Sequence, residues 1–161
     1  MDLRAVTIVR EPLVLATDQE VTDLEVMLGA KFPQGYRDYI TVLGEGVLGG
    51  TFVRVYPPWR IARDLEEWRE RINEYWFWDE GKHILSKQHA LECILIADTL
   101  QGDELIFHSR QKNLFVLPRY EEIIFLLPSD FLEAVEWMCS SGKLTRRFKE
   151  RNFEPFDSRQ F

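Results

Sequence analysis

Three carboxylates that follow one another closely could do acid–base chemistry: Asp98, Asp103 and Glu104. A general acid and a general base need two carboxyl groups whose surroundings drive their pKa values apart. These three residues flank a turn between two strand-like segments, and nothing beside them indicates such a separation. We interpret them as solvated turn acids, and a small hydrolase that uses them stays a minor alternative.

The histidines and cysteines are too few for a metal site or a nucleophilic centre. His83, His89 and Cys93 form the closest set, but Cys93 opens a strand and no second pair of cysteines accompanies it. The chain contains no Gly-x-Ser-x-Gly motif of the kind that presents a catalytic serine. The sequence therefore predicts no catalytic residue, no metal and no cofactor.

The glycines Gly44, Gly46 and Gly49 have the spacing of the dinucleotide-binding motif. That motif works where it follows a strand and opens a helix, so that the helix N-terminus faces a pyrophosphate. Here it follows a helical pattern and precedes a strand pattern. We expect residues 44–50 to end the helix and form a turn region.

Tryptophan is concentrated in one part of the chain, since Trp59, Trp68, Trp76 and Trp78 fall within twenty residues. Trp68 lies on the apolar stripe of a helix together with Ile72 and with Tyr75 or Trp76, which predicts burial. Trp59 and Trp78 lie in predicted loops, where both a core position and an anchor for a protein partner stay open. The residues predicted to contact a partner are Asp98, Asp103, Glu104, Trp59 and Trp78.

The elements that must position these side chains are short helices and short strands. Thr17 and Glu20 form a capping box before the first helix, and Asp130 and Glu133 form a similar pair before the last. From Cys93 onward, turn residues separate three or four closely spaced strands, which favours an antiparallel meander. The pattern predicts one or two strands within 5–15, helices at 18–28, 34–43, 61–76 and from 130 to 142, and strands at 51–56, 93–99, 104–109, 114–117 and 122–127.

Composition and charge narrow the functional classes. The chain has 161 residues, of which 45% are hydrophobic and 29% charged, as in a globular domain with a real core. The net charge is −7, and it divides into −10 for residues 1–142 and +3 for 143–161. An acidic body repels a phosphate backbone, which disfavours nucleic acid as the main partner. The sequence shows neither a targeting signal nor an apolar run long enough for a membrane span, and we expect a cytoplasmic protein with two reduced cysteines.

The order of these signals resembles the SUKH (Smi/Knr-like) superfamily over roughly residues 18–140. The resemblance is carried by an acidic helix that ends at Leu28-Gly29, by the pattern Phe32-Pro33-x-x-Tyr36-x-x-Tyr39-Ile40-x-x-Leu43-Gly44-x-Gly46, by Ile94 to Thr99, by Gly102 to Phe107 and by a helix that begins Ser129-Asp130-Phe131-Leu132. Three segments go beyond the pattern: 1–16, 59–80 and 143–161.

The resemblance implies an α+β fold in which helices pack on one face of a mainly antiparallel sheet, with no catalytic residues. Many bacterial members of this family are immunity proteins that neutralise a cognate toxin, often a nuclease, whereas fungal relatives are interaction hubs in cell-wall and growth signalling. We therefore expect a single domain over 1–161, with an N-terminal strand segment at 1–16 and the basic tail 143–161 docked on the body. The expected function is non-enzymatic toxin binding, with a basic toxin domain as partner; the alternative is a regulatory scaffold, and the oligomeric state is open.

Overall fold

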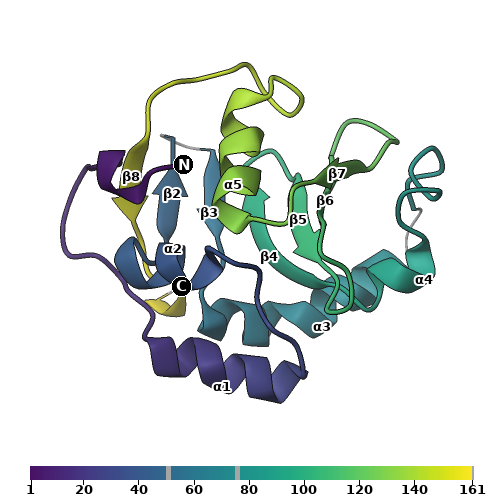
Figure 1. Ribbon diagram of the computed structural model, residues 1–161, viewed down its shortest axis with the longest axis horizontal. Coiled ribbons are helices and arrows are strands. Elements are labelled where there is room, and N and C mark those ends of the chain that lie inside the picture. Colours follow the sequence, from purple (N-terminus) through teal and green to yellow (C-terminus); the bar gives the residue numbers. More distant parts are fainter. Residues whose placement is uncertain (50–51, 75–76, 161) are drawn as a thin grey trace.

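The computed structural model describes residues 1–49, 52–74 and 77–160, so the expectations for Thr51, Tyr75 and Trp76 lie outside the described residues. Within these ranges the chain forms one sheet of eight strands in the order β1-β8-β2-β3-β4-β5-β6-β7 (Figure 1). Every pairing is antiparallel except that of β1 with β8. The strands are β1 (Thr7–Ile8), β2 (Gly46–Leu48), β3 (Val53–Val55), β4 (Ile94–Thr99), β5 (Glu104–Phe107), β6 (Leu114–Leu117), β7 (Phe125–Leu127) and β8 (Asn152–Pro155).

The helices begin and end close to where the sequence predicts them. The capping box of Thr17 and Glu20 is formed, and the first helix ends at Gly29 in the left-handed conformation, with φ 64°. Asp130 accepts a hydrogen bond from the Glu133 N–H at the start of the last helix. The α-helices are α1 (Asp18–Leu28), α2 (Tyr36–Val42), α3 (Pro58–Glu74), α4 (Lys87–Ala90) and α5 (Phe131–Ser140), and single 3-10 turns lie at Leu3–Ala5 and Ser158–Gln160.

The centre of the sheet is covered on both faces. On β5, Phe107 and Glu104 are three residues apart, so their side chains point to opposite faces. The Phe107 ring lies 5.4 Å from that of Phe32, which stacks on Tyr36 of α2, and Tyr36 in turn meets Phe131 of α5. Glu104 instead faces α3. Because both faces are occupied, every residue of β4, β5 and β6 is buried.

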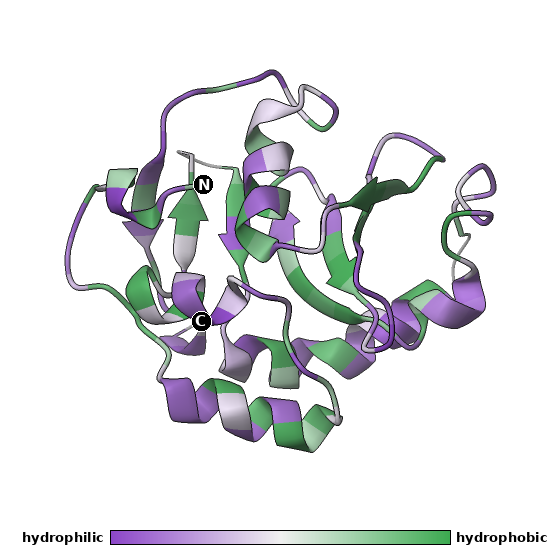
Figure 2. Cartoon of the chain, viewed as in Figure 1, coloured by the Kyte–Doolittle hydropathy of each residue, from purple (hydrophilic) through white to green (hydrophobic). Residues whose placement is uncertain are grey.

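The expected α+β class and the mainly antiparallel sheet are confirmed. Helices α2 and α5 lie on one face, and α3 covers the centre of the other through Leu65, Trp68 and Ile72, each at most 4% exposed, so helices cover both faces and not one face as expected. Figure 2 shows hydrophobic residues gathered on the strands, whereas α1 and α3 carry both hydrophobic and hydrophilic residues along their length. In the part of the chain that the structure describes, no helix combines the length and the apolar character that crossing a membrane requires.

The predicted turn region 44–50 is partly wrong, because its middle forms β2. Strand β2 pairs with β3 on one side and with β8, from the C-terminal tail, on the other. Gly46 is needed at this position: a Cβ there would lie 2.4 Å from the Phe153 ring and 2.5 Å from the Glu154 carbonyl oxygen. Gly46, which the sequence suggests as a turn residue, therefore permits close packing of β8, a strand distant in sequence.

Candidate protein-binding site

A hollow of about 530 Å³ lies between α3 and strands β4 and β5. Its α3 wall carries acidic residues at helical spacing, three or four positions apart, so that they share one flank of the helix. Glu67, Glu70 and Glu74 are exposed at this wall. Ten of the described residues line the hollow, six of them acids and one a base, and they are Tyr56, Asp64, Glu67, Trp68, Glu70, Arg71, Glu74, Leu95, Asp98 and Glu104.

Asp98 closes one end of the hollow from β4. Its two oxygens accept hydrogen bonds from Arg54 on β3, at 2.8 and 2.7 Å, and the Tyr56 hydroxyl donates a third at 2.7 Å. Burial raises the pKa of Tyr56, and the neighbouring Asp98 charge raises it further. Burial alone would lower the pKa of Arg54, but its bond and attraction to Asp98 outweigh that effect and raise it. Asp98 is therefore held as one half of a shielded ion pair.

Glu104 lies beside Asp98, because the two residues are register partners on β4 and β5. The Arg71 guanidinium on α3 reaches down to Glu104, with 2.5 Å between Nη2 and Oε2. Burial nevertheless raises the pKa of Glu104 above its ordinary value, because desolvation outweighs the attraction of Arg71. The floor of the hollow thus holds two adjacent carboxylates, each with its own arginine.

Asp103 has a different role from the one predicted. The sequence suggests exposed turn acids, but Asp98, Asp103 and Glu104 are 7%, 3% and 8% exposed. Asp103 accepts hydrogen bonds from the Thr99 hydroxyl at 2.7 Å and from the Arg119 backbone N–H at 2.8 Å. The interpretation as solvated turn acids is therefore wrong: Asp103 ties the β4–β5 turn to the end of β6, and the other two face α3.

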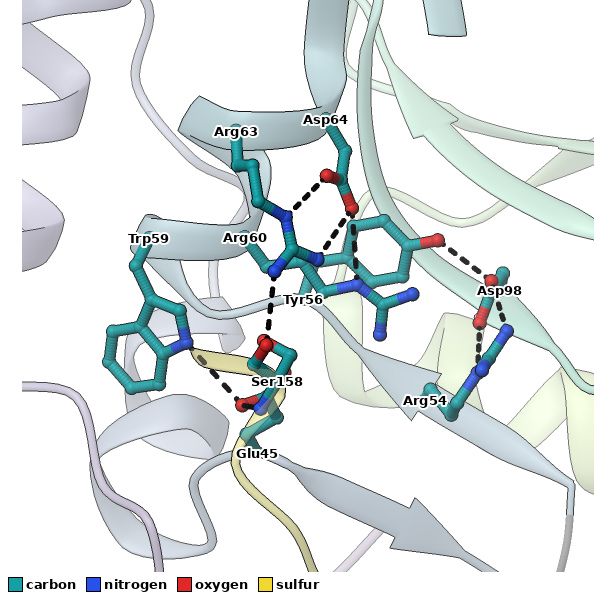
Figure 3. A network of polar contacts seen from close by, with 9 residues as sticks. All are labelled: Glu45, Arg54, Tyr56, Trp59, Arg60, Arg63, Asp64, Asp98 and Ser158. Atoms are coloured by element: carbon teal, nitrogen blue, oxygen red, sulfur yellow. Dashed lines mark hydrogen bonds and ion pairs between the residues drawn. The ribbon is translucent and has the colours of Figure 1, made fainter. Parts of the chain in front are cut away.

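A second polar network surrounds the first turn of α3 (Figure 3). Its centre is Glu45, which is 0% exposed, accepts a hydrogen bond from the Ser158 N–H at 2.9 Å, and is reached by the Trp59 indole N–H over a long 3.4 Å. Arg63 donates to the Ser158 carbonyl oxygen and pairs with Asp64. Glu45 was not predicted, because a glutamate between two glycines gives no sign that a strand from the other end of the chain will cover it.

The two predicted anchor tryptophans lie far apart along α3 and its following loop. Trp59 is half-buried in the first turn of α3, where the Arg159 guanidinium lies 4.0 Å from the centre of its ring. Trp78 is also half-buried, and its indole N–H donates to the Pro118 carbonyl oxygen at 2.8 Å. The T-shaped contact between Phe77 and Trp78 further fixes this loop. Trp78 therefore joins the end of α3 to the loop after β6.

The two cysteines and the histidine His108 are buried. Cys93 and Cys139 are free and buried, and burial raises the pKa of each thiol to about 12, which leaves them protonated. His108 lies 2.6 Å from Glu92 and is 6% exposed. Among the described residues, no three His, Cys, Asp or Glu side chains converge in a way that could hold a metal ion.

Of the five predicted contact residues, the structure brings Asp98 and Glu104 together at the hollow. It places Asp103 in a turn, Trp59 at one end of α3 and Trp78 beyond the other. The exposed acids of α3 at the mouth of the hollow were not predicted as contacts. Their signal is present in the sequence, since acids cover the polar face of this helix, but only the packing of α3 on β4 decides which of them border a cavity.

Comparison with known proteins identifies a family. The model of the SMI1/KNR4 family (SUKH-1) matches residues 15–141. A search of curated proteins found no match. The matched range contains every described residue that lines the acidic hollow, whereas β1, β8, Ser158 and Arg159 lie outside it.

Proposed function

The chain belongs to the SMI1/KNR4 family (SUKH-1), and from this premise we propose that it is a non-enzymatic binding protein that neutralises a cognate bacterial toxin. The observation that supports this proposal is the acidic hollow on the α3 side of the sheet. A hollow with six acids and one base suits the lysine and arginine side chains of a basic protein. The net charge of −7 also attracts a positively charged partner at long range.

The residues of the hollow divide between steering and holding. Glu67, Glu70 and Glu74 are exposed, so their charges reach solvent and attract a basic partner before contact. Asp98 and Glu104 are buried beside Arg54 and Arg71, so they fix the shape and charge of the floor. A nuclease toxin fits this arrangement, because nucleases present basic surfaces to phosphates. On this proposal the chain binds the toxin in the cytoplasm.

A regulatory scaffold, the alternative function, would bind its partner through the same surface but would have a different effect on the partner's activity. An immunity protein abolishes the activity of its partner, whereas a scaffold binds it and leaves the activity unchanged. The pairing of Asp98 and Glu104 with arginines supports charge display over acid–base catalysis, which needs a carboxyl group free to exchange its proton with a substrate. The raised pKa of Glu104 beside Asp98 is a feature that a general acid would also need, but each carboxyl group is bonded to an arginine, and we therefore favour charge display over the hydrolase alternative.

The test is capture and inhibition. The tagged chain is mixed with each protein encoded beside its gene, and a captured partner is assayed for toxicity and for nuclease activity with and without the chain. We expect a stoichiometric complex and loss of the partner's activity. A complex that leaves the activity intact supports the scaffold alternative, and the absence of any complex with these proteins contradicts the proposal.

Charge reversal then locates the contact. Glu67→Lys with Glu70→Lys should slow association by at least tenfold and reduce its dependence on salt, with a smaller change in the dissociation rate. The matched control is Glu11→Lys with Glu133→Lys, which changes the net charge equally at exposed positions before α1 and on α5. Equal effects of both pairs would mean that the total charge, and not the hollow, attracts the partner.

A further inference from the structure

A second recess lies on the other flank of α3, against α1. It has a volume of about 260 Å³ and is lined by Leu24 and Met27 of α1, by Pro58, Trp59 and Ala62 of α3, and by the exposed acids Glu20 and Asp23 of α1. The volume is below the roughly 300–1,000 Å³ typical of small-molecule pockets. The recess therefore suits one apolar side chain of a protein better than a free ligand.

Part of the apolar lining faces solvent, although Leu24 and Pro58 are buried and Trp59 is half-buried against the core. Met27 is 64% exposed, and the neighbouring Val26, which does not line the recess, is 77% exposed. Helix α1 buries Val21, Leu24 and Glu25, so Val26 and Met27 face solvent, and of these two Met27 lies at the recess beside α3. Exposed apolar surface rimmed by charge is characteristic of protein interaction sites.

The buried Glu45 lies next to Trp59, which forms one wall of this recess. Burying a carboxylate is costly unless its oxygens are bonded, and Glu45 Oε1 has no hydrogen-bond partner among the described residues. Its other oxygen holds the Ser158 N–H and faces the Trp59 indole, while Arg159 lies over the ring of Trp59. The C-terminal segment thereby fixes one large aromatic wall, and a fixed wall reduces the ordering cost of binding.

We infer that the recess between α1 and α3 is a docking site for one apolar side chain of a protein partner that carries lysine or arginine on either side of it. The apolar lining receives the side chain, and the exposed acids Glu20 and Asp23 attract the flanking cations. The inference rests on the proposed function, since it supplies a second contact on α3 for the same basic partner.

The two hollows can serve one partner because they lie on opposite flanks of the same helix. Asp64, Glu67 and Arg71 follow each other at helical spacing on the acidic flank, and Pro58 and Ala62 lie four residues apart on the apolar flank. A partner that straddles α3 would engage both. The acidic hollow supplies attraction, and the recess supplies the desolvated apolar contact that lengthens the lifetime of a complex.

The test uses peptides, so that it does not depend on finding the toxin. The probe is acetylated Arg-Gly-Leu-Gly-Arg amide, with Glu-Gly-Leu-Gly-Glu and Arg-Gly-Gly-Gly-Arg amides as controls. The chain has three methionines, and a ¹³C-methyl label reports on Met27 at the recess and on Met138, which is 1% exposed, as an internal reference. We expect a saturable shift of the Met27 methyl signal at about 1 mM with the first peptide only, and no shift of Met138.

Two variants decide whether the recess is the site. Ala62→Glu places a longer side chain in the recess from an exposed position on α3 and should abolish the shift. Val26→Glu adds the same charge on α1 outside the recess and should leave it unchanged. Binding by Arg-Gly-Gly-Gly-Arg, binding that survives Ala62→Glu, or no saturable shift of Met27 would each overturn the inference. Those outcomes leave the proposed function standing, since that is tested separately by toxin inhibition and by charge reversal at Glu67 and Glu70.

Discussion

Individual carboxylates in this protein differ in role according to what covers them. Asp98, Asp103 and Glu104 lie within seven positions of each other, yet one pairs with a strand arginine, one ties a turn and one pairs with a helix arginine. The prediction that they contact a partner assumed that all three are exposed. Their burial favours the exposed acids of α3 as the direct contacts, with Asp98 and Glu104 beneath them.

The role of Asp103 can be tested by removing its acceptors. Asp103→Ala leaves the buried Thr99 hydroxyl and the Arg119 N–H without their partner, and we expect the free energy of unfolding to fall by about 1–3 kcal/mol. Asp103→Asn keeps one acceptor oxygen and should cost less. Urea denaturation measures both changes, and an alanine variant as stable as the wild type would show that water replaces these bonds.

Glu104 predicts a pH dependence of stability. Its pKa is raised above the ordinary 4.5 by burial, so the folded state favours the protonated acid. The stabilisation from this group is complete below its unfolded pKa and is lost as pH rises through its folded pKa. Glutamine stays neutral, so Glu104→Gln should gain stability relative to the wild type as pH rises through that range.

Urea denaturation of both proteins over a pH series measures this difference. The gain should be larger in an Arg71→Leu background, because the attraction that opposes the rise in pKa is then absent. A difference that stays constant, or that shrinks as pH rises, would contradict burial as the dominant cause.

At the scale of elements, α3 carries residues of both the acidic hollow and the apolar recess. Its buried stripe at Leu65, Trp68 and Ile72 fixes its rotation on the sheet, and that rotation places acids on one flank and Pro58 and Ala62 on the other. The C-terminal tail completes the arrangement, because β8 carries Ser158 and Arg159 to the Trp59 network.

The docking of β8 depends on the absence of a side chain at residue 46. Gly46→Ala would place a methyl group against the Phe153 ring and the Glu154 carbonyl, and we expect β8 to separate from β2 more often. Hydrogen exchange at the Val9 and Gly49 amides, which donate to the Phe153 and Asn152 carbonyls, should become faster.

Amides of β5 and β6 serve as the internal control for this experiment, since they lie on strands that do not contact β8. Their exchange should change less than that of Val9 and Gly49. Unchanged protection at Val9 and Gly49 would show that β8 adapts to the methyl group.

At the scale of the whole molecule, one sheet joins the two ends of the chain to its middle. Strands β1 and β8 come from residues 7–8 and 152–155 and extend the sheet that runs from β2 to β7. We propose on this basis that residues 1–161 unfold as a single domain. Tryptophan fluorescence and far-ultraviolet circular dichroism should then follow one coincident transition in urea. Two separate transitions would show that the tail segment is an independent unit.

The sequence by itself determined the local structure. Thr17, Glu20 and Gly29 define both ends of α1, the apolar spacing on α3 predicts its buried stripe, and Leu114 to Leu117 form a strand as expected. These features depend on residues within one or two turns, where capping, periodicity and propensity act. The order of motifs over roughly residues 18–140, of which Pro33 to Gly46 and Ala97 to Phe107 are the most specific, also suggested the family, and the family match confirms it.

Only the tertiary structure decided which polar groups are buried and which elements meet. Glu45 and Ser158 are 113 positions apart, and strand β8 pairs with β2 across a similar separation. No local pattern carries such information, because the free energy of these contacts depends on the desolvation that both segments undergo together. Packing, and not composition, also decides three further features for the same reason. They are the burial of Asp103, the formation of β2 in a glycine-rich stretch and the two hollows beside α3.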